Sequence, residues 1–296
     1  MMATSRRSQL REQAGAPLAP HTTWRVGGPA ELLFLPRDTD ELVGFLQREQ
    51  GCPITWLGLG SNVLVRDGGV KGAVIVTAGG LGDIARDENR VHAGAGVPVA
   101  KLARFCARNG LQGLEFLAGI PGTVGGALAM NAGAAGSETW GFIDAVDVLD
   151  RNGAMRKRNK EEFIVRYRHV HGPSPNEWFV GATFRLTSAP DVDGQARIRA
   201  LLKSRNATQP MQTANAGSVF RNPPGQHAWQ LIEQAGLKGL REGAAVVSER
   251  HANFIINEGG ATAMQIETLI TRVQAAVKER VGVFLEPEVR FLGEAP

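Results

Sequence analysis

The chain has 296 residues, of which 43% are hydrophobic and 21% charged, and its net charge is +4. This length corresponds to one large or two modest domains, and this balance of apolar and charged residues excludes a disordered chain. No run of about eighteen apolar residues occurs, which excludes a membrane-spanning helix. Residues 1–15 lack the apolar stretch of a signal peptide, and the two cysteines, Cys52 and Cys106, are too few for a disulfide framework. We therefore expect a cytoplasmic protein.

The first part of the chain alternates short strands with a few amphipathic helices. Asp38 or Thr39 can cap a helix that stops at Gly51, and a second helix is predicted over residues 97–109. Cys106 lies on the apolar face of this second helix and is predicted to be a core residue. Strands are predicted at residues 54–57, 74–77, 91–93, 145–149 and 178–186.

The most basic segment of the chain is residues 151–160. Asn152-Gly153 lies near its start, and this dipeptide is typical of a two-residue hairpin turn. The segment lacks the interleaved aromatic residues of a nucleic-acid-binding platform. We therefore predict a solvated hairpin and no nucleic-acid partner.

A domain boundary is predicted at residues 187–194, which combine Ser, Pro, Asp and Gly. Beyond it we expect a helix over residues 228–235, a strand over 253–256 and a long helix capped by Thr262. The last predicted strand, residues 283–291, alternates apolar with charged residues, so that the charged residues project away from the apolar face. The pattern as a whole is α+β, with two lobes and mixed sheets.

A first glycine-rich loop, Gly58-Leu59-Gly60-Ser61-Asn62, follows directly on the predicted strand 54–57. Glycines allow the backbone to approach a pyrophosphate closely, consecutive N–H groups can form an anion-binding nest, and Ser61 and Asn62 add side-chain donors. The loop is not the GxGxxG dinucleotide fingerprint, because it lacks a third glycine in register and a surrounding βαβ unit. Taken alone, the loop is explained equally well as a plain tight turn.

A second glycine-rich segment extends from Ala118 to Gly136. It contains Gly119-Ile120-Pro121-Gly122-Thr123-Val124-Gly125-Gly126 and Asn131-Ala132-Gly133. So many glycines cost conformational entropy on folding, which a purely structural segment rarely accepts over such a length. This segment is therefore a candidate cofactor loop.

Several further landmarks occur in order along the chain. They are His21-Thr22-Thr23-Trp24-Arg25-Val26-Gly27-Gly28-Pro29-Ala30, the two glycine-rich segments, Tyr167-Arg168, Ala216-Gly217-Ser218-Val219-Phe220-Arg221-Asn222-Pro223 and Leu285-Glu286-Pro287-Glu288-Val289-Arg290. Each landmark is moderately specific, and their ordered combination is much more so. Over nearly its whole length the chain resembles the UDP-N-acetylenolpyruvoylglucosamine reductase family, known as MurB.

The resemblance implies an FAD-binding domain of the vanillyl-alcohol-oxidase type over residues 16–188, in two lobes of roughly 16–66 and 67–188. It implies a smaller α+β substrate-binding domain over residues 189–296, noncovalently bound FAD, and NADPH as the reductant. Arg25 is expected near the cofactor. The residues expected to bind FAD are Gly58, Gly60, Ser61, Asn62, Gly119, Ile120, Pro121, Gly122, Thr123, Gly125, Gly126, Asn131 and Gly133.

The resemblance also implies a reaction. In the family, NADPH reduces the flavin, and hydride then passes to the enolpyruvyl ether of UDP-N-acetylglucosamine-enolpyruvate. The product is UDP-N-acetylmuramate for peptidoglycan, and hence for cell shape and division. Negative charge develops beside the substrate carboxylate, so cations and donors must stabilise it and a proton must reach the carbon. The resemblance implies that Arg168 binds and polarises the substrate carboxylate. It implies that Glu288, in its protonated form, assists at that carboxylate and that Ser218 delivers the proton. Spacing alone favours a surface arginine, a solvated edge carboxylate and a turn serine.

Further substrate contacts are expected from Tyr167, Arg221 and Asn222. The six histidines are scattered and no HExxH motif occurs, so we expect no metal. Ala135 departs from the family pattern, since many members carry an aromatic residue there. The short interval between Tyr167 and Ser218 resembles the subclass without the long substrate-covering insertion.

Two other classes of function stay open. An oxidase or dehydrogenase on the same flavin fold would be favoured by covalent flavin attachment at His21 or His92, but neither has an attachment motif around it. A basic nucleic-acid-binding module would be colourless, whereas a flavoprotein is yellow. We expect no membrane partner and no obligate protein partner.

Overall fold

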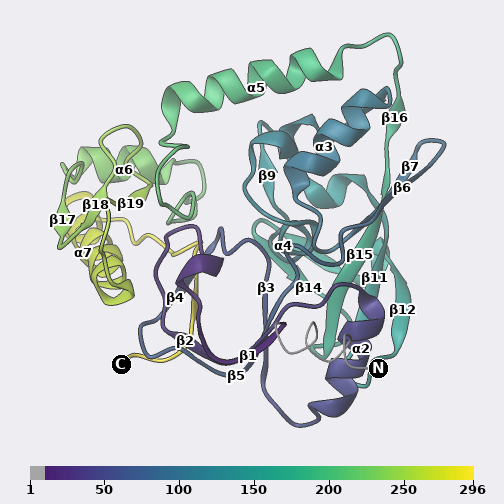
Figure 1. Cartoon of the computed structure of the whole chain (residues 1–296). Coiled ribbons are helices and arrows are strands. Elements are labelled where there is room, and N and C mark those ends of the chain that lie inside the picture. Colours follow the sequence, from purple (N-terminus) through teal and green to yellow (C-terminus); the bar gives the residue numbers. More distant parts are fainter. Residues whose placement is uncertain (1–10) are drawn as a thin grey trace. The chain divides into compact units, whose positions relative to one another are not determined.

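The structure is a computed structural model of the chain, and it describes residues 11–296. Within that range the chain forms two compact units (Figure 1). Unit 1 comprises residues 11–12, 34–59 and 75–204. Unit 2 comprises Gln13–Leu33, Gly60–Val74 and Arg205–Pro296. Each unit is therefore assembled from segments that are far apart in the sequence.

Both units mix helices with strands. Within the described residues the helices and 3₁₀ turns (η) are η1 Ala19–His21, α2 Thr39–Arg48, α3 Val99–Arg108, η2 Glu115–Gly119, α4 Val124–Met130, η3 Thr139–Phe142, η4 Lys160–Glu162, α5 Gly194–Thr208, α6 Ala228–Gln234 and α7 Ala263–Val281. The strands are β1 Glu12–Pro17, β2 Pro29–Phe34, β3 Ile54–Leu57, β4 Val63–Val65, β5 Val70–Val76, β6 Ile84–Asp87, β7 Arg90–Gly94, β8 Leu111–Gln112, β9 Gly133–Ala134, β10 Ser137–Glu138, β11 Ile143–Asp150, β12 Met155–Asn159, β13 Ile164–Arg166, β14 His169–His171, β15 Glu177–Arg185, β16 Thr187–Ser188, β17 Arg241–Glu242, β18 Ala245–Val247, β19 Ile255–Asn257 and β20 Arg290–Leu292.

The centre of unit 1 is an antiparallel five-stranded sheet with the order β12-β11-β15-β7-β6. The strands predicted at residues 91–93, 145–149 and 178–186 are confirmed as β7, β11 and β15. Helix α4 packs against β15 and β7, and α3 adds its apolar face to the same core. Cys106 is buried there, and desolvation raises the pKa of its thiol to about 12, so it is the core residue that the sequence predicts.

Helix α2 begins where the sequence predicts. The Asp38 carboxylate accepts a hydrogen bond from the Glu41 amide at 2.9 Å, so Asp38 rather than Thr39 is the N-cap. The helix ends at Arg48, three residues before the predicted stop, and Gly51 follows with a φ of +82°.

The basic hairpin is confirmed, but its turn is longer than predicted. Strands β11 and β12 pair antiparallel, and the loop between Asp150 and Ala154 has three residues rather than two. Gly153 has a φ of +84°, and its amide donates to the Asp150 carbonyl at 3.0 Å. The Asp150 carboxylate accepts hydrogen bonds from the amides of Asn152 and Ala154, which stabilises this wider turn.

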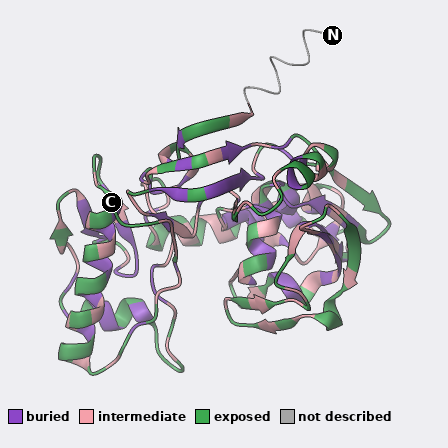
Figure 2. Ribbon diagram, turned by 90° about the horizontal axis from the view of Figure 1, so that it is seen from below, coloured by how far each residue is buried: buried purple, intermediate pink, exposed green. Residues whose placement is uncertain are grey.

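Unit 2 is built around helix α7. The Thr262 hydroxyl accepts a hydrogen bond from the Gln265 amide, and the Thr262 amide donates one to the Gln265 side-chain oxygen, which confirms the predicted cap. The helix ends at Gly282, whose φ of +79° suits a C-cap glycine. Its apolar stripe packs with α6 and the sheet β17-β18-β19 in one core that includes Trp24. Buried residues (purple in Figure 2) alternate with exposed ones along the ribbon.

Two further sheets matter for the site. Strand β20 pairs in parallel with β4. A four-stranded sheet has the order β1-β2-β5-β3, and three of the limits between the two units fall inside its strands β1, β2 and β5. The last predicted strand, residues 283–291, was too long, since β20 begins only at Arg290 and runs to Leu292. The segment before it still alternates, with Leu285 and Val289 buried and Glu286 exposed.

The compact units do not follow the predicted linear ranges. Residues 13–33 and 60–74 belong to unit 2 together with the C-terminal part of the chain. The limit after Ser204 falls inside α5, which begins at the end of the boundary segment predicted at residues 187–194. The assignment of FAD binding and substrate binding to residues 16–188 and 189–296 stays a prediction.

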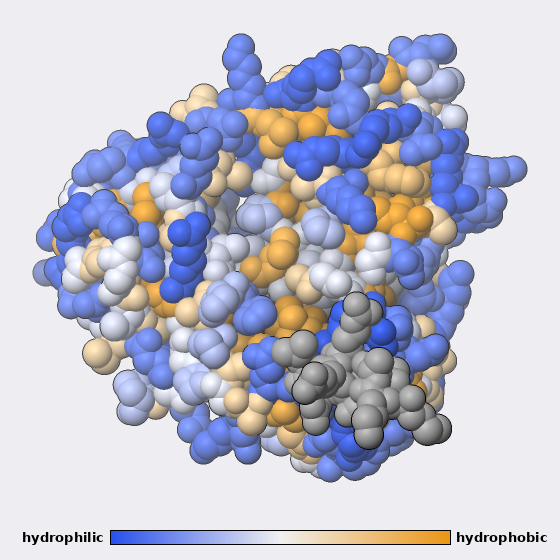
Figure 3. Space-filling model, in the orientation of Figure 1, coloured by the Kyte–Doolittle hydropathy of each residue, from blue (hydrophilic) through white to orange (hydrophobic). Residues whose placement is uncertain are grey.

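The face seen in Figure 3 is largely hydrophilic, with smaller hydrophobic areas between the charged side chains. Across residues 11–296, no helix has the length and hydrophobicity needed to cross a membrane.

Candidate functional site

The two predicted glycine-rich stretches meet in unit 1 at the start of α4. Thr123 caps this helix, because its hydroxyl accepts a hydrogen bond from the Gly126 amide at 3.4 Å. A Cβ on Gly58 would lie 2.5 Å from that hydroxyl oxygen, which is closer than any real contact allows. Glycine at position 58 therefore lets the loop after β3 lie directly against the cap.

The amides around this cap are of two kinds. Those of Val124 and Gly125 already donate to backbone carbonyls in the loop before α3, both at 2.9 Å. Those of Gly122 and Thr123 donate to no protein group in residues 11–296. Successive amides of this kind are donors that a diphosphate uses. Because glycine also leaves the approach to them open, the segment fits the FAD that the resemblance implies.

Asn131 and Gly133 shape the segment from within. Asn131 ends α4 in the left-handed region, with a φ of +40°, and its side chain is buried. Its side-chain amide nitrogen donates to the Glu138 carboxylate at 2.8 Å, and its side-chain oxygen accepts from the Trp140 backbone amide at 3.2 Å. Gly133 pairs with Glu138 between β9 and β10. The Asn131 side chain is therefore already engaged within the protein, and its expected contact with FAD stays a prediction.

Ala135 lies at the tip of the hairpin formed by β9 and β10. Ala135 and Gly136 form its two-residue turn, with φ values of +52° and +79°. Two successive residues with positive φ are the mark of a type I′ turn. The position where this chain departs from the family pattern is therefore an exposed turn.

Arg168 is anchored on the glycine-rich segment. Tyr167 and Arg168 form the two-residue turn between β13 and β14, and Arg168 has a φ of +53°, which is uncommon for a residue with a side chain. Its guanidinium donates to the backbone carbonyls of Asn131 and Gly133, both at 3.1 Å. Its side chain is only 15% exposed. The structure thus excludes the surface arginine that spacing alone favours.

Ser218 and Glu288 lie at neighbouring positions in unit 2. The Glu288 amide donates to the Val219 carbonyl at 2.7 Å, and Phe220 forms an antiparallel bridge with Pro287. Both Ser218 and Glu288 are half-buried. The structure therefore brings together two of the three predicted catalytic residues, and Arg168 belongs to unit 1.

Asn253 holds the Ser218 segment in place and was missed by the sequence analysis. Its side-chain amide donates to the Phe220 carbonyl at 2.8 Å, and its side-chain oxygen accepts from the Phe220 amide at 2.9 Å. Its own carbonyl accepts from the Val219 amide at 2.9 Å. The side chain is buried. In the sequence, Asn253 directly precedes an apolar run, and it was interpreted only as the start of a strand.

The second half of the first glycine-rich loop supports Glu288. The Asn62 side chain donates to the Glu288 carbonyl at 3.1 Å, and the Arg290 amide donates to the Asn62 carbonyl at 3.0 Å. A Cβ on Gly60 would lie 2.1 Å from the His21 carbonyl oxygen, so this position requires glycine. Arg25 has a φ of +59° in the same unit. Asn62 thus positions backbone at the candidate site, and ligand contacts of Gly60, Ser61 and Arg25 stay predictions.

Arg221 and Asn222 differ in what they can offer a ligand. The Arg221 guanidinium lies 3.8 Å from the Glu286 carboxylate, and its buried Nε has no partner among residues 11–296. The Asn222 side-chain oxygen accepts a hydrogen bond from the Ala228 amide at 3.0 Å, at the start of α6. The Arg221 Nε is therefore unpaired within residues 11–296, whereas the Asn222 oxygen already supports a helix, and substrate contacts of both residues stay predictions.

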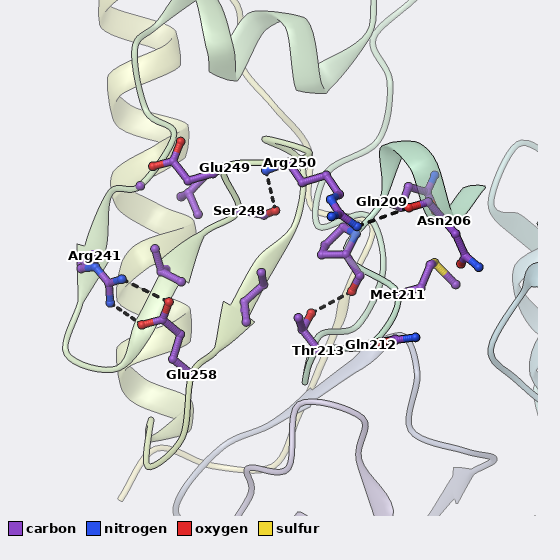
Figure 4. Close-up of a pocket in the computed structure, with 15 residues that line it drawn as sticks. Asn206, Gln209, Met211, Gln212, Thr213, Arg241, Ser248, Glu249, Arg250 and Glu258 are labelled. Carbon is purple, nitrogen blue, oxygen red and sulfur yellow. Dashed lines mark hydrogen bonds and ion pairs between the residues drawn. The ribbon is translucent and has the colours of Figure 1, made fainter. Parts of the chain in front are cut away.

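Unit 2 also contains a pocket of about 550 Å³, lined by the turn after α5 and by residues of β17, β18 and β19 (Figure 4). Arg241 and Glu258 form an ion pair at its edge, with N···O distances of 2.6 and 3.1 Å. The Thr213 hydroxyl donates to the Pro210 carbonyl at 2.8 Å. The predicted site residues do not line this pocket, and we assign no ligand to it.

Comparison with known proteins first defines the class. Residues 30–158 match the family described as FAD binding domain. Residues 209–292 match the family described as UDP-N-acetylenolpyruvoylglucosamine reductase, C-terminal domain. An FAD-binding domain joined to a reductase domain makes this chain an FAD-dependent oxidoreductase.

Full-length relatives then define the family. A UDP-N-acetylenolpyruvoylglucosamine reductase of Alkalilimnicola ehrlichii is 56% identical over 297 residues, which cover 100% of this chain and 99% of the relative. One of Methylococcus capsulatus is 55% identical over 281 residues, covering 94% and 92%. The crystal structure of MurB from Thermus caldophilus superposes with a TM-score of 0.82 at 38% identity, covering 94% of this chain and 98% of that one.

This chain belongs to the UDP-N-acetylenolpyruvoylglucosamine reductase (MurB) family. The predicted family, the α+β fold class and the FAD cofactor are thereby confirmed.

Proposed function

We propose that this protein reduces the enolpyruvyl ether of UDP-N-acetylglucosamine-enolpyruvate to UDP-N-acetylmuramate in peptidoglycan precursor synthesis. NADPH is the electron source, and bound FAD supplies the capacity to accept and transfer hydride. The observation that supports this most strongly is 56% identity to a reductase of that name over the whole chain. We place the reaction in the cytoplasm, with no obligate protein partner.

In this proposal Arg168 binds the substrate carboxylate. A guanidinium stays charged and can grip a carboxylate with two parallel hydrogen bonds. Negative charge that develops beside the carboxylate during hydride transfer is then stabilised by a cation already in place. The anchoring of Arg168 on two backbone carbonyls supports this role, because a fixed cation needs no reorganisation when charge develops.

In this proposal Ser218 and Glu288 act on neighbouring groups of the substrate. Ser218 delivers the proton to the carbon, and Glu288, in its protonated form, donates a hydrogen bond at the carboxylate. Their neighbouring places on one backbone ladder support a shared task. Tyr167, Arg221 and Asn222 contribute further substrate contacts in this proposal.

The purified protein is expected to carry FAD noncovalently. Within residues 11–296 the amides of Gly122 and Thr123 are open to a diphosphate, and no attachment motif surrounds His21 or His92. Acid precipitation should therefore release the yellow colour into the supernatant, where chromatography identifies FAD. A colourless protein that fails to bind added FAD would contradict the cofactor assignment, and colour retained in the acid pellet would favour the covalent flavin oxidase alternative.

A further inference from the structure

The Arg168 guanidinium is surrounded by groups of unit 1 that fix its direction. Its Nη1 donates to the Asn131 carbonyl and its Nη2 to the Gly133 carbonyl. The Tyr167 ring lies beneath it, with 4.7 Å from Cζ to the ring centroid. Because both carbonyls belong to the glycine-rich segment, any shift of that segment moves the guanidinium with it.

A carboxylate that no predicted role uses lies beside this cation. Glu138 Oε1 is 3.8 Å from Arg168 Nη1, and Glu138 Oε2 accepts a hydrogen bond from the Asn131 side-chain amide at 2.8 Å. The Asn131 side chain is itself fixed, since it is 1% exposed and accepts a hydrogen bond from the Trp140 amide. A buried amide thus holds the half-exposed Glu138 carboxylate beside the guanidinium.

The backbone conformation of Arg168 is a second, independent observation that this residue is fixed in place. Arg168 and Asn131 both have positive φ, at +53° and +40°. A residue with a side chain adopts this region at a cost, and such conformations persist only where the surroundings determine them. Arg168 is therefore held in an unfavourable backbone conformation, whereas Asn131 ends α4 in a region that asparagine tolerates.

We propose that Glu138 is a positioning residue for the reduction step, and that it acts through Arg168. Its carboxylate, held by Asn131, keeps the guanidinium in the one orientation that receives the substrate carboxylate. This inference rests on the proposed function of Arg168. Glu138 itself does not touch the substrate, and its negative charge opposes binding of the substrate carboxylate while it orders the cation that binds it.

Glu138→Gln separates these two effects. Glutamine keeps an oxygen that can accept from Asn131 but removes the charge that orders the guanidinium. Flavin reoxidation by saturating enolpyruvyl substrate should slow about tenfold, since misplacement of a catalytic group by an ångström can cost up to about 100-fold. The half-saturating substrate concentration should stay level or fall, because a repelling charge is gone. Flavin reduction by NADPH should stay within about twofold of wild type.

Two controls decide whether the effect runs through Arg168. Glu161→Gln removes an exposed carboxylate elsewhere in unit 1 and should leave both half-reactions unchanged. In an Arg168→Lys background, Glu138→Gln should add no further loss. A wild-type reoxidation rate in Glu138→Gln, or an equal additional loss in the Arg168→Lys background, would overturn the positioning role.

A readout without substrate keeps this test separate from the proposed function. The ¹⁵N NMR signal of the Arg168 side chain, assigned by its loss in Arg168→Lys, should broaden or move in Glu138→Gln and stay in place in Glu161→Gln. An unchanged signal would overturn the inference even if the wild-type protein turns over. A wild-type protein that fails to reduce the enolpyruvyl substrate would instead contradict the proposed function, whatever the signal does.

Discussion

Replacing Ser218 by alanine is expected to leave flavin reduction by NADPH near the wild-type rate and to slow reoxidation by the enolpyruvyl substrate about 10²- to 10⁴-fold. The first half-reaction needs no proton at the product carbon, whereas the second does. A serine hydroxyl is a weak acid, so its use as a donor depends on geometry against a basic carbon centre. Stopped-flow flavin absorbance measures each half-reaction separately.

The structure makes Ser218→Ala a clean substitution. The contacts that hold this segment to Glu288 and Asn253 are made by the backbone of Val219 and Phe220, so removing the Ser218 hydroxyl leaves them intact. Ser218→Cys should recover part of the lost rate, because a thiol can also donate a proton. Reoxidation of Ser218→Ala at the wild-type rate would remove Ser218 from the mechanism.

Arg168→Lys should slow reoxidation by about 100- to 1,000-fold, which corresponds to roughly 3–4 kcal/mol of lost charge stabilisation. Lysine keeps the charge, but its single nitrogen cannot reproduce the two carbonyl contacts of Arg168 together with a two-pronged grip on a carboxylate. Flavin reduction by NADPH should change much less, because the substrate carboxylate takes no part in it.

The matched control for this substitution is Arg199→Lys. Arg199 is 69% exposed and, among residues 11–296, pairs only with an exposed carboxylate, Asp193, so its replacement should leave both half-reactions unchanged. Equal damage to both half-reactions in Arg168→Lys would show that Arg168 is a structural residue of the glycine-rich segment.

Local patterns predicted most of the secondary structure, because caps and periodicity act over a few residues. Asp38 and Thr262 cap the helices that they were expected to cap. The predictions were wrong where a particular side-chain contact or strand pairing changes the outcome. The Asp150 carboxylate widens the turn at Asn152-Gly153 to three residues, and the pairing partner of the last strand, β4, is available only to Arg290–Leu292.

The residue ranges of the two compact units could not be predicted from local patterns, for a different reason. Segments 13–33 and 60–74 join the C-terminal part of the chain through contacts between distant residues. The Trp24 indole N–H, for example, donates to the Ile255 carbonyl at 2.8 Å. The sequence around either residue gives no indication of its partner. The sequence therefore allowed only a linear division of the chain.

At the candidate site, the ordered motifs identified the candidate catalytic residues but not the residues that hold them in place. Ser218 and Glu288 were singled out by resemblance, and the structure adds that backbone hydrogen bonds place them at neighbouring positions. Asn253 and Glu138 were missed, because each acts through hydrogen bonds to residues more than five positions away. Such supports become visible only when the fold brings the partners together.

The most direct test of the account is anaerobic mixing of the flavin-reduced protein with UDP-N-acetylglucosamine-enolpyruvate, followed by flavin absorbance and product analysis. We expect the oxidised flavin spectrum to return without oxygen and UDP-N-acetylmuramate to form in an amount equal to the flavin reoxidised. A flavin that stays reduced with this substrate, yet is reoxidised when oxygen is admitted, would contradict it.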